Sequence, residues 1–224
     1  MKKALFCLQN EFIEKILAER GLVDKDSYIL RSKEEVTLSI IDKINPDLIF
    51  FPHWSFRVPE EVIQKYSCIC FHSTPLPYGR GGSPIQNMIS RGHLKTEVCA
   101  LLMVEAFDAG PIFLRNEISL EGKLSDILNR VYNTIANQIS LLLEENIEPI
   151  EQVGEPTLFK RLTGKDNLIP ETSDLSKVFD KIRMLDSDLY PSSYINYNSL
   201  TLEFSDANFF DDRVEAKVIF RNKK

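Results

Sequence analysis

The chain has 224 residues, of which 43% are hydrophobic and 27% are charged, and its formal net charge at pH 7 is −6. This length can bury one domain with a small additional module. The acidic balance argues against a protein that coats nucleic acid or an anionic membrane, and no apolar run approaches the roughly 20 residues of a membrane span. The first apolar run meets Gln9 too soon for a secretory signal peptide.

The first seventy residues alternate short apolar runs with amphipathic stretches. The expected strands are residues 2–8, 27–30, 47–51 and 67–72, and the expected helices between them are residues 11–20, 32–44 and 59–66. Ser32 followed by Glu35 resembles a capping box at the start of the second helix. The repeated strand–helix alternation predicts an α/β fold with an open, mostly parallel, doubly wound sheet, whose ligands bind beyond the carboxyl ends of the strands.

The second half of the chain predicts a change of architecture. The expected elements are a helix at 83–92 capped by Ser83, a strand at 96–105 with an antiparallel partner at 112–119, a long helix at 124–143, a helix at 173–186 capped by Ser173, and short antiparallel strands near the end. We therefore expect a main domain at residues 1–165 and a small C-terminal module, one helix plus antiparallel strands, at 166–224. The aromatic residues of its tail could form a homodimer interface or pack on their own domain: Tyr194, Tyr197, Phe204, Phe209 and Phe210.

Two histidines, His53 and His72, follow predicted buried strands. His72 leads into a loop with three prolines and three glycines, PLPYGRGGSP, whose backbone can approach a ligand closely. A catalytic histidine usually needs an orienting carboxylate, and Asp108 in the short segment AFDAGP is the candidate. The alternative readings are a histidine that is satisfied in the core and an aspartate that only shapes a turn.

The sequence does not favour a metal site or a P-loop. There are three histidines and four cysteines, with no HxxxH or HExxH pattern, and Cys68 and Cys70 are too close for a zinc knuckle. The same spacing is poor geometry for a disulfide, so we expect a reduced, cytoplasmic protein. GxxxxGK[ST] and GxGxxG motifs do not occur.

The segment HSTPLPYGRGGSPI, from His72 to Ile85, resembles the signature H-x-x-x-L-P-x-x-R-G-x-x-P-I of the N10-formyltetrahydrofolate-dependent formyltransferases. Similar segments follow the family's order on either side: PDLIFF with VPEEVI at 46–63, FDAGPIF at 107–113 and FKR at 159–161. The resemblance covers residues 46 to about 161. It implies a Rossmann-like fold, N10-formyltetrahydrofolate as co-substrate, no metal, and transfer of a formyl group to an amine.

By this resemblance, His72 and Asp108 match two of the family's three catalytic positions. The third position is an asparagine in the family and Cys70 in this chain. An asparagine amide can donate to the oxyanion of the tetrahedral intermediate, whereas a thiol is a much weaker donor. His53 is our candidate for a substitute donor. Plain strand packing of Cys70, and a folate-binding protein without enzymatic activity, are the alternatives.

The resemblance also implies two ligand sites. The folate pterin is expected against two stretches of backbone, Phe56, Arg57, Val58 and Pro59, and Val104, Glu105, Ala106, Phe107 and Asp108. The acceptor substrate is expected near Tyr78, Gly79, Arg80, Gly81, Gly82, Lys160 and Arg161. The planar fork of Arg80 suits a diphosphate, although a loop-surface charge is an equal alternative.

The segments FFPHWSF and DAGPIF, with the stretch from Asp186 to Pro191, are similar to sugar N-formyltransferases of the pseudaminic-acid type. This similarity implies a small nucleotide-sugar acceptor, a UDP-linked 4-amino-4,6-dideoxy-N-acetyl-altrosamine or a relative, in cell-surface glycan biosynthesis. Methionyl-tRNA formyltransferases usually carry a larger, basic C-terminal barrel, whereas the tail of this chain is short and acidic to neutral, so we do not expect a nucleic acid as partner. Without an apolar run of membrane-spanning length, we do not expect a membrane partner either. Methionyl-tRNA and glycinamide ribonucleotide are the alternative acceptors.

Overall fold

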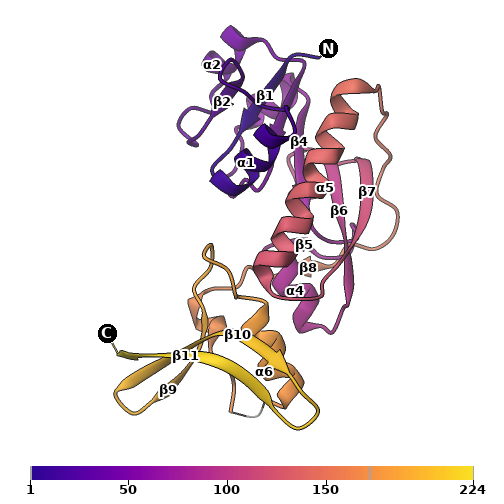
Figure 1. Ribbon diagram of the computed structural model, residues 1–224. Helices are drawn as coiled ribbons and strands as arrows, with labels where there is room; N and C mark the ends of the chain where they lie inside the picture. Colours follow the sequence, from indigo (N-terminus) through magenta and orange to yellow (C-terminus); the bar gives the residue numbers. More distant parts are fainter. Residues whose placement is uncertain (1, 172, 224) are drawn as a thin grey trace. The chain divides into compact units, whose positions relative to one another are not determined.

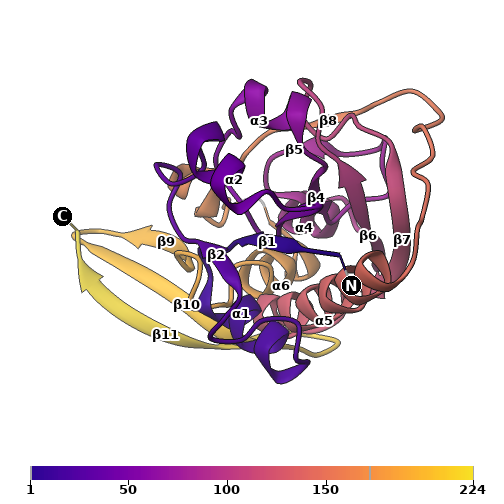
Figure 2. The same ribbon diagram turned by 90° about the horizontal axis from the view of Figure 1, so that it is seen from above.

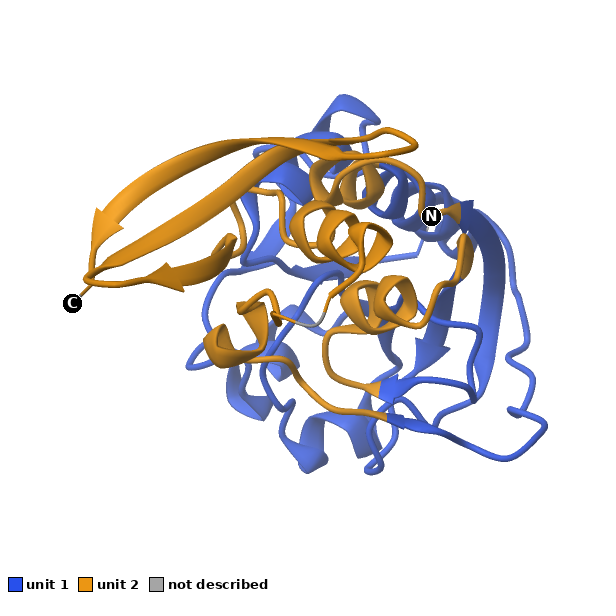
Figure 3. Cartoon of the chain, turned by 90° about the horizontal axis from the view of Figure 1, so that it is seen from below, with its two compact units in different colours: residues 1–80, 97–118, 130–158 blue, residues 81–96, 119–129, 159–224 orange. Residues whose placement is uncertain are grey.

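The computed structural model describes residues 2–171 and 173–223. Contacts divide the chain into two compact units, each assembled from separate stretches of sequence (Figure 3). Unit 1 comprises residues 1–80, 97–118 and 130–158, and unit 2 comprises residues 81–96, 119–129 and 159–224. In the part of the chain that is described, no helix has the length and apolar character required to cross a membrane.

A six-stranded sheet forms the centre of unit 1, in the order β2-β1-β3-β4-β6-β7 (Figure 1). Its strands are β1 (Ala4–Cys7), β2 (Tyr28–Leu30), β3 (Leu48–Phe51), β4 (Cys68–His72), β6 (Lys95–Leu102) and β7 (Ile112–Ser119). β2, β1, β3 and β4 pair in parallel, whereas β6 runs antiparallel to β4. The prediction of a mostly parallel sheet is confirmed.

Helices cover both faces of this sheet (Figure 2). α2 (Leu38–Ile44) and α3 (Glu60–Lys65) lie on one side of β1, and α1 (Glu11–Glu19) and α5 (Leu124–Glu144) lie on the other. β1, β3 and β4 are almost continuously apolar because they are buried on both faces. This arrangement is the doubly wound fold that the strand–helix alternation predicts.

The second helix begins at Leu38, six residues later than predicted, because Thr37 and not Ser32 supplies its cap. The pairing of Ser32 and Glu35 does occur, but it serves the turn before the helix. The Glu35 carboxylate accepts hydrogen bonds from the backbone N–H groups of Arg31 at 2.6 Å and Ser32 at 2.9 Å. The predicted interaction between Ser32 and Glu35 is therefore present, but it lies in the turn before α2 and not at the start of the helix.

β6 ends at Leu102 rather than at residue 105, and its direction matters for the site. Its register pairs Cys99 with His72 and Leu102 with Ile69. The carboxyl end of β6 therefore lies beside the amino end of β4, away from His72. The loop that follows Leu102 must therefore bring Asp108 toward His72 before β7 begins.

Unit 2 contains the small C-terminal module that the sequence predicts. Its elements are α4 (Pro84–Ser90), the 3-10 helix η1 (Gly164–Asn167), α6 (Leu175–Arg183), β9 (Ser193–Tyr197), β10 (Leu200–Phe209) and β11 (Val214–Asn222). β10 pairs antiparallel with both β9 and β11. Asp174, and not Ser173, caps α6 by accepting from the backbone of Lys177 at 2.8 Å. A two-stranded sheet pairs β5 (Arg80–Gly81) with β8 (Leu158–Phe159).

One aromatic residue of the tail packs within its own module. Phe209 lies 5.5 Å from Phe179 of α6, measured between ring centroids. The buried Arg183 of the same helix donates to the carbonyl oxygen of Gly122 at 3.1 Å and to that of Leu120 at 2.5 Å. These contacts fix α6 against β10 and against the segment before α5 inside unit 2. A homodimer interface stays a prediction.

Candidate active site

His72, the last residue of β4, is the centre of the site. Its side chain is buried, and its Nε2 lies 2.8 Å from the carbonyl oxygen of Gly79. A carbonyl oxygen can only accept, so the Nε2 atom carries the proton of this hydrogen bond. Nδ1 lies 3.6 Å from Oδ2 of Asp108. The imidazole is thus held at one nitrogen by a backbone carbonyl and faces a carboxylate with the other.

Asp108 reaches His72 because the loop after β6 folds back. The backbone of Asp108 is left-handed, with φ of 52°. A side chain at Gly110 would place its Cβ 1.8 Å from the carbonyl oxygen of Leu102, so only glycine allows this close return. The sequence reasoning placed Asp108 near His72 because both follow strands. That reason is wrong, since β6 and β4 run in opposite directions and the loop makes the approach.

Gln152 links this loop to Arg80, and the sequence reasoning missed it. The side-chain amide of Gln152 donates to the backbone carbonyls of Asp108 at 2.8 Å and Gly110 at 2.9 Å. Its oxygen accepts from Nε and Nη2 of Arg80 at 3.1 and 2.7 Å. Arg80, predicted as a substrate contact, is therefore tied to the loop that carries Asp108. A lone glutamine between turn residues gives no sequence signal for such a role.

Thr157 holds the other side of the site. Its hydroxyl accepts from the backbone N–H of Gly79 at 2.7 Å, and its backbone N–H donates to the carbonyl oxygen of Pro77 at 3.2 Å. Its own carbonyl oxygen accepts from the backbone of Arg80 at 3.0 Å. The loop from Pro77 to Arg80, which includes the predicted substrate residue Tyr78, is therefore fixed next to His72 by a residue far away in the sequence.

Cys70 points into an apolar environment. Its half-buried side chain packs against the buried Leu76, Leu101 and Ile112. Burial, together with the charge of Asp108, raises the pKa of the Cys70 thiol well above its usual range. The thiol is protonated at neutral pH and is a poor nucleophile. This packing agrees with the alternative that Cys70 serves only to pack its strand against the core.

His53 belongs to a second polar group. Phe51 of β3 pairs with Cys70 of β4, so the chain leaves β3 at the level of His72, as predicted. The Nδ1 atom of His53 lies 3.2 Å from the hydroxyl of Tyr132, and this hydroxyl also accepts from the Asn10 side chain at 2.8 Å. Asn10 caps α1 and Tyr132 lies on α5. The sequence analysis does not single out Tyr132, and a tyrosine within a long amphipathic helix gives no signal of this contact.

The two stretches predicted to hold folate both belong to unit 1 and expose apolar side chains. Phe107 is 68% exposed and Phe56 is 42% exposed. Phe56 packs edge-on against Trp54, with 5.7 Å between ring centroids. The neighbours Arg57, Glu105 and Ala106 are exposed, whereas Val58 is buried and Pro59 is the N-cap residue of α3. Both stretches thus carry exposed aromatic rings, and their role in binding folate stays a prediction.

The predicted substrate residues of unit 2 are packed against one another. A Cβ atom at Gly81 would lie 2.5 Å from the carbonyl oxygen of Phe159, and one at Gly82 would lie 2.4 Å from Cβ of Arg161. The side chain of Asn87 donates to the carbonyl oxygen of Lys160 at 3.0 Å. Gly81 and Gly82 therefore allow the backbone at Phe159 and Arg161 to pack closely against them. The sequence analysis explained these glycines by the approach of a ligand instead. Among residues 2–171 and 173–223, no group of three or more His, Cys, Asp and Glu side chains is placed to hold a metal ion.

Comparison with protein families gives two matches. Residues 19–145, more than half of the chain, match the family described as formyl transferase. Residues 164–221 match the family described as the C-terminal domain of methionyl-tRNA formyltransferase.

Individual relatives agree with these matches. The methionyl-tRNA formyltransferase of Rickettsia felis is 29% identical over 188 residues, which are 80% of this chain and 61% of that protein. The chain therefore spans less than two thirds of the length of the curated relatives it matches. A solved structure of a methionyl-tRNA formyltransferase from Clostridium thermocellum is 34% identical, covers 100% of both chains and superposes with a TM-score of 0.94. A sugar N-formyltransferase from a Shewanella species is 16% identical, covers 92% of this chain and 98% of its own, and superposes with a TM-score of 0.68, so it shows the fold alone.

These findings overturn the predicted acceptor. The nucleotide-sugar acceptor, the glycan pathway and the exclusion of a nucleic-acid-linked substrate are wrong, because the similarity is to methionyl-tRNA formyltransferases and includes their C-terminal domain. Segments such as DAGPIF lie within residues 19–145, which match the formyl transferase family as a whole, so they do not distinguish the acceptors. The prediction of the enzyme family itself is confirmed. From its sequence match and its fold, this chain belongs to the formyl transferase family.

Proposed function

We propose that this chain transfers the formyl group of N10-formyltetrahydrofolate to the α-amino group of methionyl-tRNA. The observation that carries the proposal is the match of residues 164–221 to the C-terminal domain of methionyl-tRNA formyltransferase. The similarity to the Clostridium thermocellum chain supports it, because it extends over the whole of both chains.

The proposed site has groups suited to this reaction. The amine attacks the formyl carbon, a new C–N bond forms, and the tetrahedral intermediate carries an oxyanion and an ammonium. The bond from this carbon to N10 of the folate then breaks, and the proton lost by the ammonium ends on N10. Asp108 and Nδ1 of His72, 3.6 Å apart, are placed to hold and pass on such a proton. No covalent enzyme intermediate is needed.

The charge of the C-terminal residues limits how RNA would be bound. Residues 164–221 contain eleven Asp and Glu residues against seven Lys and Arg residues. Phosphate contacts depend on Lys and Arg, so this stretch supports only a few of them. We infer that the aminoacyl end of the tRNA provides a large part of the recognition.

The test is a formylation assay with purified full-length chain and N10-formyltetrahydrofolate. Methionyl-tRNA, the same tRNA without its amino acid, and free methionine are offered as acceptors. We expect formyl-methionyl-tRNA as the product, and a loss of at least about 100-fold in rate for His72→Asn. His93→Asn, outside the site, is the matched control. Absence of any product from methionyl-tRNA would refute the proposed acceptor.

A further inference from the structure

An exposed stretch of unit 1, residues 150–157, contacts both loops that carry the candidate catalytic groups. We call it the bridging segment. It begins where Ile150 and Ile112 exchange two backbone hydrogen bonds, of 2.8 and 2.9 Å. Its apolar side chains do not anchor it, since Ile150 is 74% and Val153 is 86% exposed. Polar contacts therefore determine its position.

The first contact is made by Gln152, whose hydrogen-bonding groups are all used inside the site. The two amide hydrogens go to the carbonyl oxygens of Asp108 and Gly110, and the amide oxygen accepts twice from Arg80. An amide is the one uncharged side-chain group that can donate two hydrogen bonds and accept two at once. A glutamate at this position would instead place a carboxylate oxygen, which cannot donate, against the carbonyl oxygens of Asp108 and Gly110.

The second contact is made by Thr157 and acts on His72 through Gly79. The Thr157 hydroxyl accepts from the backbone N–H of Gly79, and the carbonyl oxygen of Gly79 accepts from Nε2 of His72. The hydroxyl of the buried Thr74 lies 3.3 Å from the same carbonyl oxygen. The orientation of the imidazole thus depends on where Thr157 holds the glycine.

We propose that Gln152 and Thr157 are positioning residues, which together set the approach of Asp108 to His72. Arg80 completes the connection, because its guanidinium contacts Gln152 and its backbone contacts Thr157. A substrate group that binds Arg80 would therefore act on the same bridge. The catalytic consequence rests on the proposed function, whereas the effect on the His72 ring does not.

The kinetic test uses side chains of nearly unchanged shape. Gln152→Met removes the amide, and Thr157→Val removes the hydroxyl. We expect each to lower kcat for formylation of methionyl-tRNA by about 10- to 100-fold, because small displacements of reacting groups have effects of this size. The KM for N10-formyltetrahydrofolate and the melting temperature should change little. Thr157→Ser, which keeps the hydroxyl, should restore most of the rate.

The matched control for the glutamine is Gln64→Met. Gln64 lies on the exposed surface of α3, where it bonds to Glu60, and its replacement should leave kcat unchanged. Wild-type rates in both Gln152→Met and Thr157→Val would overturn the proposal. So would equal losses in Thr157→Val and Thr157→Ser, since the hydroxyl would then not be the cause.

A second readout does not require turnover. Long-range proton–nitrogen NMR spectra report which nitrogen of each imidazole is protonated, and this chain has only three histidines. We expect the His72 signals, assigned with His72→Asn, to show a proton at Nε2 and to shift in Thr157→Val but not in Gln64→Met. Unchanged His72 signals in Thr157→Val would refute the link through Gly79, even in a protein that fails to formylate methionyl-tRNA.

Discussion

The hydroxyl of Tyr132 lies 3.2 Å from Nδ1 of His53. The same hydroxyl accepts from the Asn10 amide, and its own proton can be donated to Nδ1 when this nitrogen is unprotonated. The neutral imidazole of His53 then carries its hydrogen on Nε2, as an N–H donor. A site with a thiol at position 70 lacks the amide donor of the family. An N–H donor on His53, near the end of β3, would supply a replacement.

The first prediction concerns this donor. If His53 stabilises the oxyanion, Tyr132→Phe should lower kcat by about 10- to 100-fold, because the tautomer and orientation of the ring are no longer fixed. Cys70→Asn should restore most of this loss by supplying an amide donor. Single-turnover formylation by the two single variants and the double variant measures both effects. Independent losses, with no rescue, would exclude His53 as the substitute.

The second prediction concerns the thiols. Burial raises the pKa of Cys68 to about 12 and that of Cys99 to about 11, and it shifts Cys7 and Cys70 in the same direction. Since the thiolate is the reactive form, a thiol reagent at pH 8 should modify none of the four within minutes in the folded protein and all four in guanidinium chloride. Fast labelling of Cys70 in the folded protein would contradict its packing.

The third prediction concerns the loop that carries Asp108. Gly110→Ala should destabilise the protein by about 1–3 kcal/mol, because the added Cβ collides with the carbonyl oxygen of Leu102. It should also impair formylation, since the loop can accept the methyl group only by moving. Gly164→Ala is the control, because a Cβ there meets no atom within 4 Å. Urea unfolding of both variants tests the difference.

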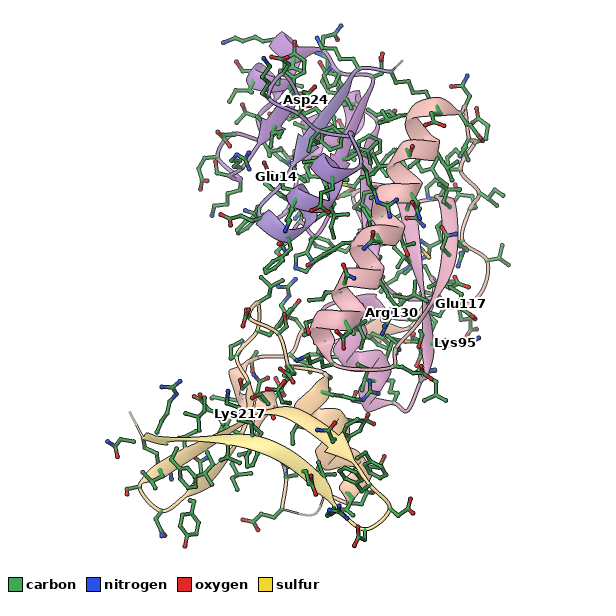
Figure 4. All side chains as sticks on the ribbon, in the orientation of Figure 1. Glu14, Asp24, Lys95, Glu117, Arg130 and Lys217 are labelled. Carbon is green, nitrogen blue, oxygen red and sulfur yellow. The ribbon has the colours of Figure 1, made fainter. Side chains whose placement is uncertain are left out.

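The fourth prediction concerns acid stability. The hydrogen bond from Arg31 lowers the pKa of Glu14, which projects from α1 (Figure 4). In the unfolded chain the pKa of a glutamate is about 4.3. The contribution of this pair is therefore fully present above that pH and is lost as the pH falls through the lower folded value.

The size of this contribution should be below about 1 kcal/mol, because Arg31 is largely exposed. Glu14→Gln should destabilise the protein at pH 7 but hardly at pH 2.5, as measured by urea unfolding. Glu19→Gln, on the same helix and 3.9 Å from Lys15, is the exposed control. An equal loss at both pH values would show that Glu14 acts through packing instead of charge.

The fifth prediction concerns the binding of tRNA. With an acidic surplus in residues 164–221, the logarithm of the affinity for methionyl-tRNA should fall with the logarithm of salt concentration at a slope shallower than about −3. Lys217, exposed on β11 (Figure 4), is a candidate phosphate contact. Lys217→Ala should reduce the slope by about one. A steep slope that Lys217→Ala leaves unchanged would place the RNA on other basic residues.

Local patterns were sufficient for most of the fold, and they singled out His72 and Asp108, whose side chains lie 3.6 Å apart in the structure. Their catalytic role stays a prediction. Buried strands and amphipathic helices follow from the periodicity of apolar residues, which depends on neighbours in the sequence. The start of α2 was missed because Ser32 and Glu35 form their bonds in a turn, and a capping pattern does not reveal which segment it serves.

The supporting residues of the site could not be predicted in the same way. The side chains of Gln152, Thr157 and Tyr132 form hydrogen bonds with partners that lie between 42 and 122 positions away in the sequence. Their residue types are common in loops and helix faces, so only the folded chain gives them a role. The acceptor was missed for a related reason, since the motifs near His72 report the shared chemistry and not the amine.

Because β6 runs antiparallel to β4, the length of the loop between Leu102 and Ile112 determines where Asp108 lies relative to His72. Because Leu102 lies beside Ile69 and not beside His72, the loop has to place Asp108 so that its carboxylate reaches the imidazole. We expect that inserting or deleting one residue in this loop would displace the carboxylate from the imidazole. The length of this loop therefore matters for activity as much as the identity of its residues does. A change of length would be one way for a chain of this fold to lose catalytic activity while its sheet stays intact.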